Sequence, residues 1–289
     1  MKKVVVTGAG GFIGGHLVGA LKGKGYKVRA VDKKPLNQWY QVTNGVDNLV
    51  LDLTIKENCY TAANGYNEVF NLAADMGGMG FIETHKAECM LSVLINTHML
   101  MAARDCGIDR YFYASSACVY NGDLQTDPEN PGLKESDAYP ALAEDGYGWE
   151  KLFSERMCRH FMEDYGIITR VARFHNVYGP HGTYDGGREK APAAICRKVI
   201  ESELYGKDEI LIWGDGHQTR SFMYIDDCIK GILDIMYSNI EEPINLGSSE
   251  MVSINQLVDI VEKIAGRKLN RSYDLSAPKG VRGRNSENT

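Results

Sequence analysis

Residues 3–14 read Lys3-Val-Val-Val-Thr-Gly-Ala-Gly-Gly-Phe-Ile-Gly14, a β-branched run followed by a glycine-rich turn. The run predicts a short buried strand from Lys3 to Thr7, and the residues from Phe12 to Lys22 predict a helix. Glycines at positions 8, 11 and 14 permit a tight turn and let the N–H groups at the helix start approach a pyrophosphate. A glycine series by itself also fits a plain turn, so the prediction of a dinucleotide site depends on the residues that follow.

An acidic residue stands where a dinucleotide site needs one. Asp32 ends the next predicted strand, Lys27 to Asp32. Its spacing along the sequence from Gly14 is that of the carboxylate that binds an adenosine ribose diol. Because a carboxylate repels a 2′-phosphate, Asp32 favours NAD over NADP, although Lys33 and Lys34 weaken that preference. Asp52 and Leu53 follow the third predicted strand, where Asp52 either contacts the adenine edge, which we favour, or caps a turn.

Strands and helices alternate along the first 178 residues. This order predicts an α/β fold, a Rossmann-type doubly wound parallel sheet. We expect residues 1–178 to form an NAD-binding domain, to which later segments return, and residues 179–289 to form mainly a nucleotide-sugar-binding lobe. Ser253 and Gln256 predict a capping box at the start of a helix from Ile254 to Ala265. Further strands are expected at 46–51, 68–72, 110–115 and 168–174, and helices at 87–106 and 147–165.

Composition excludes several other classes of protein. The formal net charge is -6 and the sequence pI is about 5.7, which argues against a nucleic-acid-binding surface, because such a surface needs a basic face. No run approaches the ~20 apolar residues of a membrane span. The cysteines are scattered and never form a CxxC pair, which predicts a reduced, cytoplasmic chain with neither a disulfide framework nor a metal site.

Tyr147-Gly-Trp-Glu-Lys151 places a phenol and an ammonium four residues apart on a predicted helix. On a helix the two side chains lie on one face. A phenol is a poor base at its usual pKa near ~10, and a nearby ammonium together with a positive nicotinamide is expected to lower that value. The same pair also fits an ordinary helix surface, so its meaning depends on the dinucleotide site upstream.

Together these motifs resemble the extended short-chain dehydrogenase/reductase family, the NAD-dependent epimerases and dehydratases. The resemblance rests on the glycine turn, on Tyr147 and Lys151, and on Ser115-Ser-Ala-Cys-Val-Tyr120. Arg173-Phe-His-Asn-Val-Tyr-Gly-Pro180 and Gly214-Asp-Gly-His-Gln-Thr-Arg220 are similar to two further family segments. The resemblance covers nearly the whole chain and implies catalysis by Ser116, Tyr147 and Lys151. The residues expected to bind NAD are Gly8, Gly11, Phe12, Ile13, Gly14, Asp32, Asp52, Leu53, Ala73, Tyr147 and Lys151.

Three segments resemble more specifically the branch of this family that epimerises GDP-mannose at C3 and C5. They are Asn71-Leu-Ala-Ala-Asp-Met-Gly-Gly-Met-Gly-Phe81, the 115–120 segment, and Gly186-Gly-Arg-Glu-Lys-Ala-Pro-Ala-Ala194. The resemblance implies GDP-mannose or a related nucleotide sugar as substrate, and Cys118 and Lys190 as an acid/base pair that acts after oxidation at C4. From the residues alone, Cys118 also fits a core position and Lys190 a solvated loop charge.

The resemblance also implies a set of substrate-binding residues, a homodimer and a C-terminal segment beyond residue 289 in other family members. The homodimer would form through the helices at 87–106 and 147–165. The chain ends at Thr289, whereas family members continue, so we expect the substrate lobe to lack its last segment. Arg282 is expected to pair with the diphosphate. The residues expected to contact substrate are Gly77, Gly78, Ser116, Cys118, Asn176, Glu189, Lys190, Lys198, Gln218, Arg220 and Arg282.

Two other hypotheses stay open on the sequence alone. One is another enzyme on the same scaffold, a 4-epimerase or a dehydratase, which product analysis would separate. The other is a catalytically impaired dinucleotide-binding protein. Such proteins commonly lose the tyrosine or the lysine, whereas Tyr147 and Lys151 are both present here.

Overall fold

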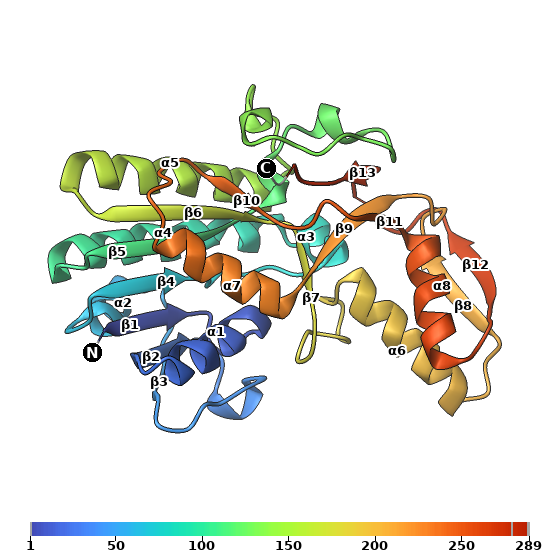
Figure 1. Cartoon of the computed structure of the whole chain (residues 1–289), viewed down its shortest axis with the longest axis horizontal. Helices are drawn as coiled ribbons and strands as arrows, with labels where there is room; N and C mark the ends of the chain where they lie inside the picture. The colour runs from blue at the N-terminus through green and yellow to red at the C-terminus, as the bar shows by residue number, and fades with distance from the viewer. Residues whose placement is uncertain (1, 279, 288–289) are drawn as a thin grey trace.

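A seven-stranded sheet forms the centre of the molecule in the computed structural model, which describes residues 2–278 and 280–287 (Figure 1). Its strand order is β10-β6-β5-β4-β1-β2-β3, and every neighbouring pair is parallel. The predicted doubly wound α/β fold is confirmed. The strands are β1 (Lys3–Thr7), β2 (Lys27–Asp32), β3 (Asp47–Val50), β4 (Glu68–Asn71), β5 (Arg110–Ser116), β6 (Ile168–Phe174) and β10 (Ile244–Leu246).

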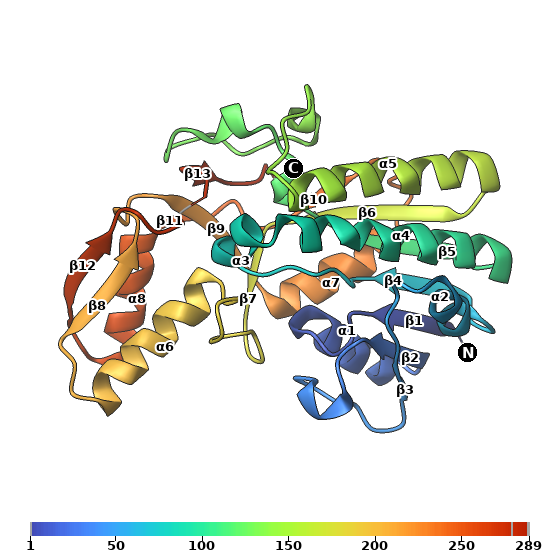
Figure 2. The ribbon, with the colours of Figure 1, turned by 180° about the vertical axis from the view of Figure 1, so that it is seen from behind.

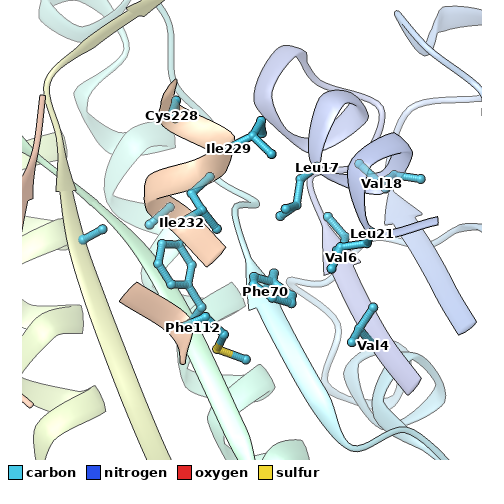
Figure 3. Packing of buried hydrophobic residues seen from close by; sticks show 14 of the residues in the cluster. Val4, Val6, Leu17, Val18, Leu21, Phe70, Phe112, Cys228, Ile229 and Ile232 are labelled. Atoms are coloured by element: carbon cyan, nitrogen blue, oxygen red, sulfur yellow. The ribbon is translucent and has the colours of Figure 1, made fainter. Parts of the chain in front are cut away.

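Helices cover both faces of this sheet (Figures 1 and 2). Successive strand residues point to opposite faces, so Val4 and Val6 pack with one set of helices and Val5 with the other. On the first face lie α1 (Phe12–Gly23) and α7 (Ile225–Met236), whose apolar side chains meet Phe70 and Phe112 (Figure 3). On the second face lie α2 (Lys56–Ala63), α4 (Lys86–Cys106) and α5 (Tyr147–Tyr165).

A second, smaller core lies in the lobe formed by later residues, on the right in Figure 1. Here α6 (Ala191–Leu204) and α8 (Ile254–Ala265) pack against the parallel pair of β8 (Glu209–Trp213) and β12 (Asn270–Asp274). A further sheet joins the lobe to the central sheet. It consists of β7 (Asn176–Tyr178), β9 (Thr219–Tyr224), β11 (Met251–Ser253) and β13 (Gly283–Arg284).

The predicted elements match the structure to within a residue or two at each end. The Ser253–Gln256 capping box is confirmed, with both reciprocal hydrogen bonds present. The helices α2, α6 and α7, the short helix α3 (Met79–Thr84) and the strands from β7 onward were not predicted from the sequence. The expectation about the chain end concerns Thr289, which lies outside the described residues.

A buried ion pair fastens α5 to the sheet. The Arg173 guanidinium donates to both carboxylate oxygens of Glu155, at 3.0 and 2.8 Å, and Ser115 donates to the same carboxylate at 2.5 Å. Lys151 donates to the Ala114 carbonyl oxygen at 3.0 Å. These contacts hold α5 against β5 and β6 at Lys151 and Glu155. Among the residues that the structure describes, none of the helices is long and apolar enough to cross a membrane.

The glycine turn gives a first prediction. A Cβ atom at Gly14 would lie 2.2 Å from the Gly8 carbonyl oxygen, which is backbone and has no room to move. We expect Gly14→Ala to lower the free energy of unfolding by about 3 kcal/mol, the upper range for overpacking. Gly19→Ala, in the same helix with nothing within 4 Å, should leave stability equal or slightly higher. Urea unfolding checks both, and equal values for the two variants would contradict the account.

Candidate active site

The turn between β1 and α1 forms a cradle that only glycines permit. Gly8 has φ of 69°, in the left-handed region, and a Cβ there would lie 2.9 Å from the Leu72 carbonyl carbon. Gly11 caps α1 without a side-chain hydrogen bond. The N–H groups of the first helical turn, next to Phe12 and Ile13, therefore face outward at the positive end of the helix dipole. This cradle fits a dinucleotide pyrophosphate.

Asp32 is held beside this turn. Its carboxylate accepts hydrogen bonds from the N–H groups of Gly10 and Lys34, both at 3.0 Å. The two lysines that weakened the preference for NAD are engaged elsewhere: Lys33 pairs with Asp75 at 2.9 Å, and Lys34 Nζ donates to the Gly10 carbonyl oxygen at 2.8 Å. The negative charge that disfavours a 2′-phosphate therefore stands at the turn while both ammonium groups are occupied.

Asp52 takes part in a turn at the end of β3. Its Oδ1 accepts from the backbone N–H and the hydroxyl of Thr54, at 2.9 and 2.7 Å, and the bond from the Thr54 N–H lowers the pKa of Asp52. The turn-capping alternative is therefore present in the structure. Asp52 also borders the cleft described next, so the turn and an adenine contact are compatible.

A cleft of about 1190 Å³ opens along the carboxyl ends of the central strands, the edge at which open α/β sheets bind ligands. All the residues predicted to bind NAD border it: Gly8, Gly11, Phe12, Ile13, Gly14, Asp32, Asp52, Leu53, Ala73, Tyr147 and Lys151. Gly77, Ser116 and Lys190 border it as well. Within residues 2–278 and 280–287, no group of three or more His, Cys, Asp or Glu side chains is placed to hold a metal ion.

Tyr147 and Lys151 meet at the start of α5. Tyr147 is the first residue of the helix and is only 5% exposed. The Lys151 ammonium lies 5.5 Å from the centroid of the Tyr147 ring and 3.8 Å from the Glu150 carboxylate. Ser116, at the end of β5, accepts a hydrogen bond from the Cys118 N–H at 3.2 Å. The structure thus brings together the three residues of the family motif.

The expected lowering of the Tyr147 pKa involves a bound nicotinamide and stays a prediction, because the protein groups act in the opposite direction. Burial raises the pKa of Tyr147 well above its usual value, and Cys118 and Glu150 raise it further, while the Ser116 hydroxyl opposes them. Lys151 does not reverse this effect, because its ammonium donates to a backbone carbonyl and lies beside the carboxylate of Glu150.

Cys118 and Lys190 occupy the same buried region. Cys118 lies just after β5, in the single-turn helix η2 (Ala117–Val119), and burial raises its pKa to about 12. Lys190 caps the N-terminus of α6, and burial lowers its pKa, with Arg284 acting in the same direction and Cys118 opposing. Lys190 is therefore desolvated rather than a solvated loop charge, the alternative that the residues alone allowed. The cation near it is Arg284, whereas Arg188 pairs with Asp75 at 2.8 Å.

Arg284, Glu144 and Gln125 join this region, although the sequence analysis missed all three. The Arg284 guanidinium donates from Nε to Gln125 Oε1 at 2.7 Å and from Nη1 to Cys118 Sγ at 3.6 Å, and its Nη2 donates to Glu144 Oε1. No local pattern reveals these partners, because Arg284 is 140 positions from Glu144 along the chain. The only available signal was the position of Glu144, three residues before Tyr147.

The Gly77–Gly78 turn differs from its expected role. We expected both backbone N–H groups to face the hexose, but the N–H of Gly78 donates to the Arg188 carbonyl oxygen at 3.0 Å. A Cβ at Gly78 would lie 2.4 Å from the Glu189 carbonyl oxygen. The turn therefore holds the backbone next to Lys190 in place, and only Gly77 borders the cleft.

The remaining predicted substrate residues divide into two groups. Arg220 is partly buried near Arg284, Glu144 and Cys118, and desolvation lowers its pKa to about 10. The others make contacts within the lobe. Three of them donate to backbone carbonyl oxygens: Asn176 to Ser221 at 3.3 Å, Lys198 to Leu211 at 2.7 Å and Gln218 to Trp213 at 2.8 Å. The other two form ion pairs, Arg282 with the Asp215 carboxylate at 3.0 Å and Glu189 with Arg197 at 3.3 Å.

Comparison with known proteins agrees with this geometry. Residues 4–247 match the model of the NAD dependent epimerase/dehydratase family. The chain belongs to this family. The predicted family and its dependence on NAD are thereby confirmed.

Two plant members of the epimerase family are close relatives in sequence. GDP-mannose 3,5-epimerase 1 from Oryza sativa subsp. japonica is 48% identical over 99% of this chain and 75% of its own length. GDP-mannose 3,5-epimerase from Arabidopsis thaliana is 47% identical over 99% of this chain and 75% of its own length.

Solved structures of the epimerase family share the fold. MoeE5 in complex with UDP-glucose and NAD has a TM-score of 0.82 and 27% identity, covering 99% of this chain and 89% of that one. The UDP-glucose 4-epimerase from Thermotoga maritima has a TM-score of 0.87, with coverage of 99% and 90%, but at 23% identity it supports the fold alone.

Asp32 gives a prediction about cofactor choice. Asp32→Asn should weaken binding of NAD by about tenfold or more, the usual effect of losing a charged hydrogen bond, and should weaken NADP much less. Calorimetric titration of the cofactor-free protein with both dinucleotides measures this. Asp47→Asn, which changes an exposed carboxylate paired with Arg29, is the control. An equal loss for both cofactors would mean that Asp32 only supports the turn.

Proposed function

We propose that this chain epimerises GDP-mannose at C3 and C5 through a transient 4-keto sugar, with enzyme-bound NAD. The products are GDP-L-galactose, and GDP-L-gulose where only C5 is inverted. The observation that carries the proposal is the buried cluster in which Cys118 interacts with both Tyr147 and Lys190. The two plant GDP-mannose 3,5-epimerases, at 47% and 48% identity, support the choice of substrate.

The cofactor half of the cleft would hold NAD through the glycine turn and Asp32. Bound there, NAD would supply a reversible hydride acceptor for C4 of the sugar and a positive charge in the site. Tyr147 then removes the proton from the C4 hydroxyl. Because burial raises the pKa of Tyr147 in the chain alone, we expect the phenolate to form only in the loaded site, where Lys151 and the added charge act together.

Inversion at a carbon beside the ketone needs a group on each face of the sugar. The 4-ketone acidifies the hydrogens on C3 and C5, and one group removes a proton while the other returns one from the opposite side. Cys118 and Lys190 approach from β5 and α6, two different parts of the chain. This arrangement supports their assignment as the pair.

The lobe would hold the nucleotide and the sugar. Asp215 engages Nη1 of Arg282, and Nη2 and Nε are the nitrogens that would bind the diphosphate. Arg220 supplies a second, largely desolvated guanidinium. The other residues proposed to contact substrate are Gly77, Ser116, Asn176, Glu189, Lys198 and Gln218, whereas Gly78 supports the neighbouring backbone.

An exposed apolar face supports a homodimer. Helices α4 and α5 pack side by side on one face of the sheet and leave several large apolar side chains in solvent. Contiguous apolar patches commonly mark interaction sites, and a two-fold axis would bury the same patch of each copy. The side chains are Met90, Leu91, Leu94, Trp149 and Phe153.

The domain division and the compartment are also part of the proposal. We place NAD binding in residues 1–178 and sugar binding mainly in residues 179–289. The strand β10 and the helix α7 come from the later half and lie on the central sheet, in keeping with later segments that return to it. The seven cysteines are all free, which is in keeping with a reducing, cytoplasmic location.

Tyr147→Phe should lose nearly all epimerisation while the fold stays intact, because no group remains to accept the C4 hydroxyl proton. General-base catalysis contributes about 100- to 10,000-fold. NMR analysis of products from GDP-mannose gives the rate. Tyr165→Phe, at the exposed end of the same helix, is the matched control. A Tyr147→Phe enzyme within a factor of a few of wild type removes Tyr147 from the mechanism.

The Cys118–Lys190 pair gives an isotope prediction. In heavy water we expect solvent deuterium at both C3 and C5 of the product, since the returning proton comes from a group that exchanges with solvent. Cys118→Ala and Lys190→Ala should each block inversion and still permit transient NADH absorbance from hydride transfer at C4. Cys118→Ser tests the acid itself, because a hydroxyl is a far weaker acid than a thiol.

Cys106→Ala, at the end of α4, is the control for loss of a thiol and should behave as wild type. If Cys118→Ala still inverts the sugar at the wild-type rate, the 3,5-epimerase assignment loses its main support. A product inverted only at C4 would favour a simple 4-epimerase.

A further inference from the structure

Glu144 is a buried carboxylate beside Cys118 that the mechanism above does not use. Its backbone N–H donates to the Cys118 carbonyl oxygen at 2.9 Å, and its own carbonyl accepts from the Gly148 N–H at 2.8 Å, in the first turn of α5. One carboxylate oxygen, Oε1, accepts from Arg284. The other, Oε2, is buried without a hydrogen-bond partner among the described residues.

Charged and titratable groups from several segments of the chain surround Cys118. Glu144 acts to raise the pKa of the thiol, and Arg284 and the Ser116 hydroxyl act to lower it. Cys118 also interacts electrostatically with three further groups, from α5, α6 and β9, which are Tyr147, Lys190 and Arg220. Apolar contacts with Phe81, Ile82 and Cys89 complete its surroundings.

A carboxylate at this place has a clear electrostatic consequence. Nearby cations stabilise a thiolate and make a cysteine reactive at neutral pH. Two guanidinium groups, Arg220 and Arg284, interact with Cys118, and so does the desolvated Lys190, while Glu144 is the carboxylate among its interaction partners. The hydrogen bonds of Arg284 to Gln125 and to Glu144 fix the guanidinium plane, which leaves Nη1 on the sulfur.

We propose that Glu144 is a positioning residue for the proton-transfer pair: fixed by Arg284, its carboxylate keeps Cys118 a thiol in the resting enzyme. Lys190 then takes the first proton from the sugar, and Cys118 returns one to the opposite face. This assignment of direction rests on the proposed function, but the thiol state of Cys118 does not.

The step balances. The Lys190 amine takes the proton as the C–H bond beside the ketone breaks, and the electron pair passes to the C4 oxygen as an enolate. The enolate carbon then takes the proton of the Cys118 S–H on its other face as the C=O bond re-forms. The sugar gains one proton for the one lost, and the pair ends as an ammonium and a thiolate. Burial lowers the pKa of Lys190, which favours the neutral amine that this step requires.

The test measures the ionisation of Cys118 directly in the NAD-loaded protein, without substrate. Iodoacetamide alkylates thiolates, so its rate on the Cys118 peptide, resolved by mass spectrometry from the other cysteines, gives a midpoint in pH. Glu144→Gln removes the carboxylate charge and Arg284→Gln removes the guanidinium. Both variants break the same ion pair, yet we expect their midpoints to move in opposite directions.

For Glu144→Gln we expect the midpoint of Cys118 alkylation to fall by at least one pH unit. At any pH below both midpoints, the variant would then hold about tenfold more Cys118 thiolate than the wild type. For Arg284→Gln we expect the midpoint to rise. If Glu144 only holds the segment around Arg284 in place, both variants raise the rate of Cys118 alkylation at all pH values and neither midpoint shifts. That result, or midpoints that move together, overturns the proposal.

Two further variants control for folding and charge. Glu144→Asp keeps the charge and should return the midpoint towards wild type, even if its packing is imperfect. Glu262→Gln removes another buried carboxylate, paired with Lys268 and Arg271 in the lobe, and should leave the Cys118 midpoint unchanged. A Glu262→Gln shift as large as that of Glu144→Gln would contradict a local role for Glu144.

The pH dependence of kcat tests the direction of proton transfer separately. In Glu144→Gln the alkaline limb of the kcat profile for GDP-mannose epimerisation should move to lower pH, since Cys118 loses its proton earlier. An unmoved limb, with a shifted alkylation midpoint, refutes Cys118 as the first donor. Absence of epimerisation in the wild type refutes the proposed function instead, and the alkylation result stands by itself.

Discussion

The close approach of two backbone segments at Gly8 and Gly14 is the constraint on which the site depends. With 2.2 Å between a Gly14 Cβ and the Gly8 oxygen, no other residue fits without moving β1 away from α1. Because β1 lies inside the sheet, between β4 and β2, this turn fixes the start of α1 at the carboxyl edge. Asp32 and Ser116 end strands at the same edge, which is why one cleft holds both.

The two halves of the cleft solve different physical problems. The cofactor half offers backbone groups and one carboxylate, and its lysines are occupied by Asp75 and by the Gly10 carbonyl. The catalytic half gathers side-chain charges from β9, β13, α6 and the segment before α5. A chain with net charge -6 thus concentrates Lys190, Arg220 and Arg284 where an anionic nucleotide sugar would bind, and compensates them with Glu144.

Burial has the same effect on all three reacting groups. Desolvation disfavours the charged form of any group, so it raises the pKa of Tyr147 and of Cys118 and lowers that of Lys190. In the chain by itself, burial therefore favours the neutral phenol, the neutral thiol and the neutral amine. Catalysis then depends on charge that arrives with the ligands, which couples proton transfer to a loaded site.

The sequence by itself determined the glycine turn, the acid at Asp32, the Tyr147–Lys151 pair and the capped helix α8, because each depends on spacing within a few residues. Tertiary structure alone decided that Arg284 meets Glu144 and Cys118, that Arg282 meets Asp215, and that Gly78 binds Arg188. It also decided that burial raises the pKa of Tyr147, so that the expected lowering depends on the bound cofactor. Local spacing fixes backbone geometry, whereas desolvation and charge pairing depend on which distant segments bury a side chain.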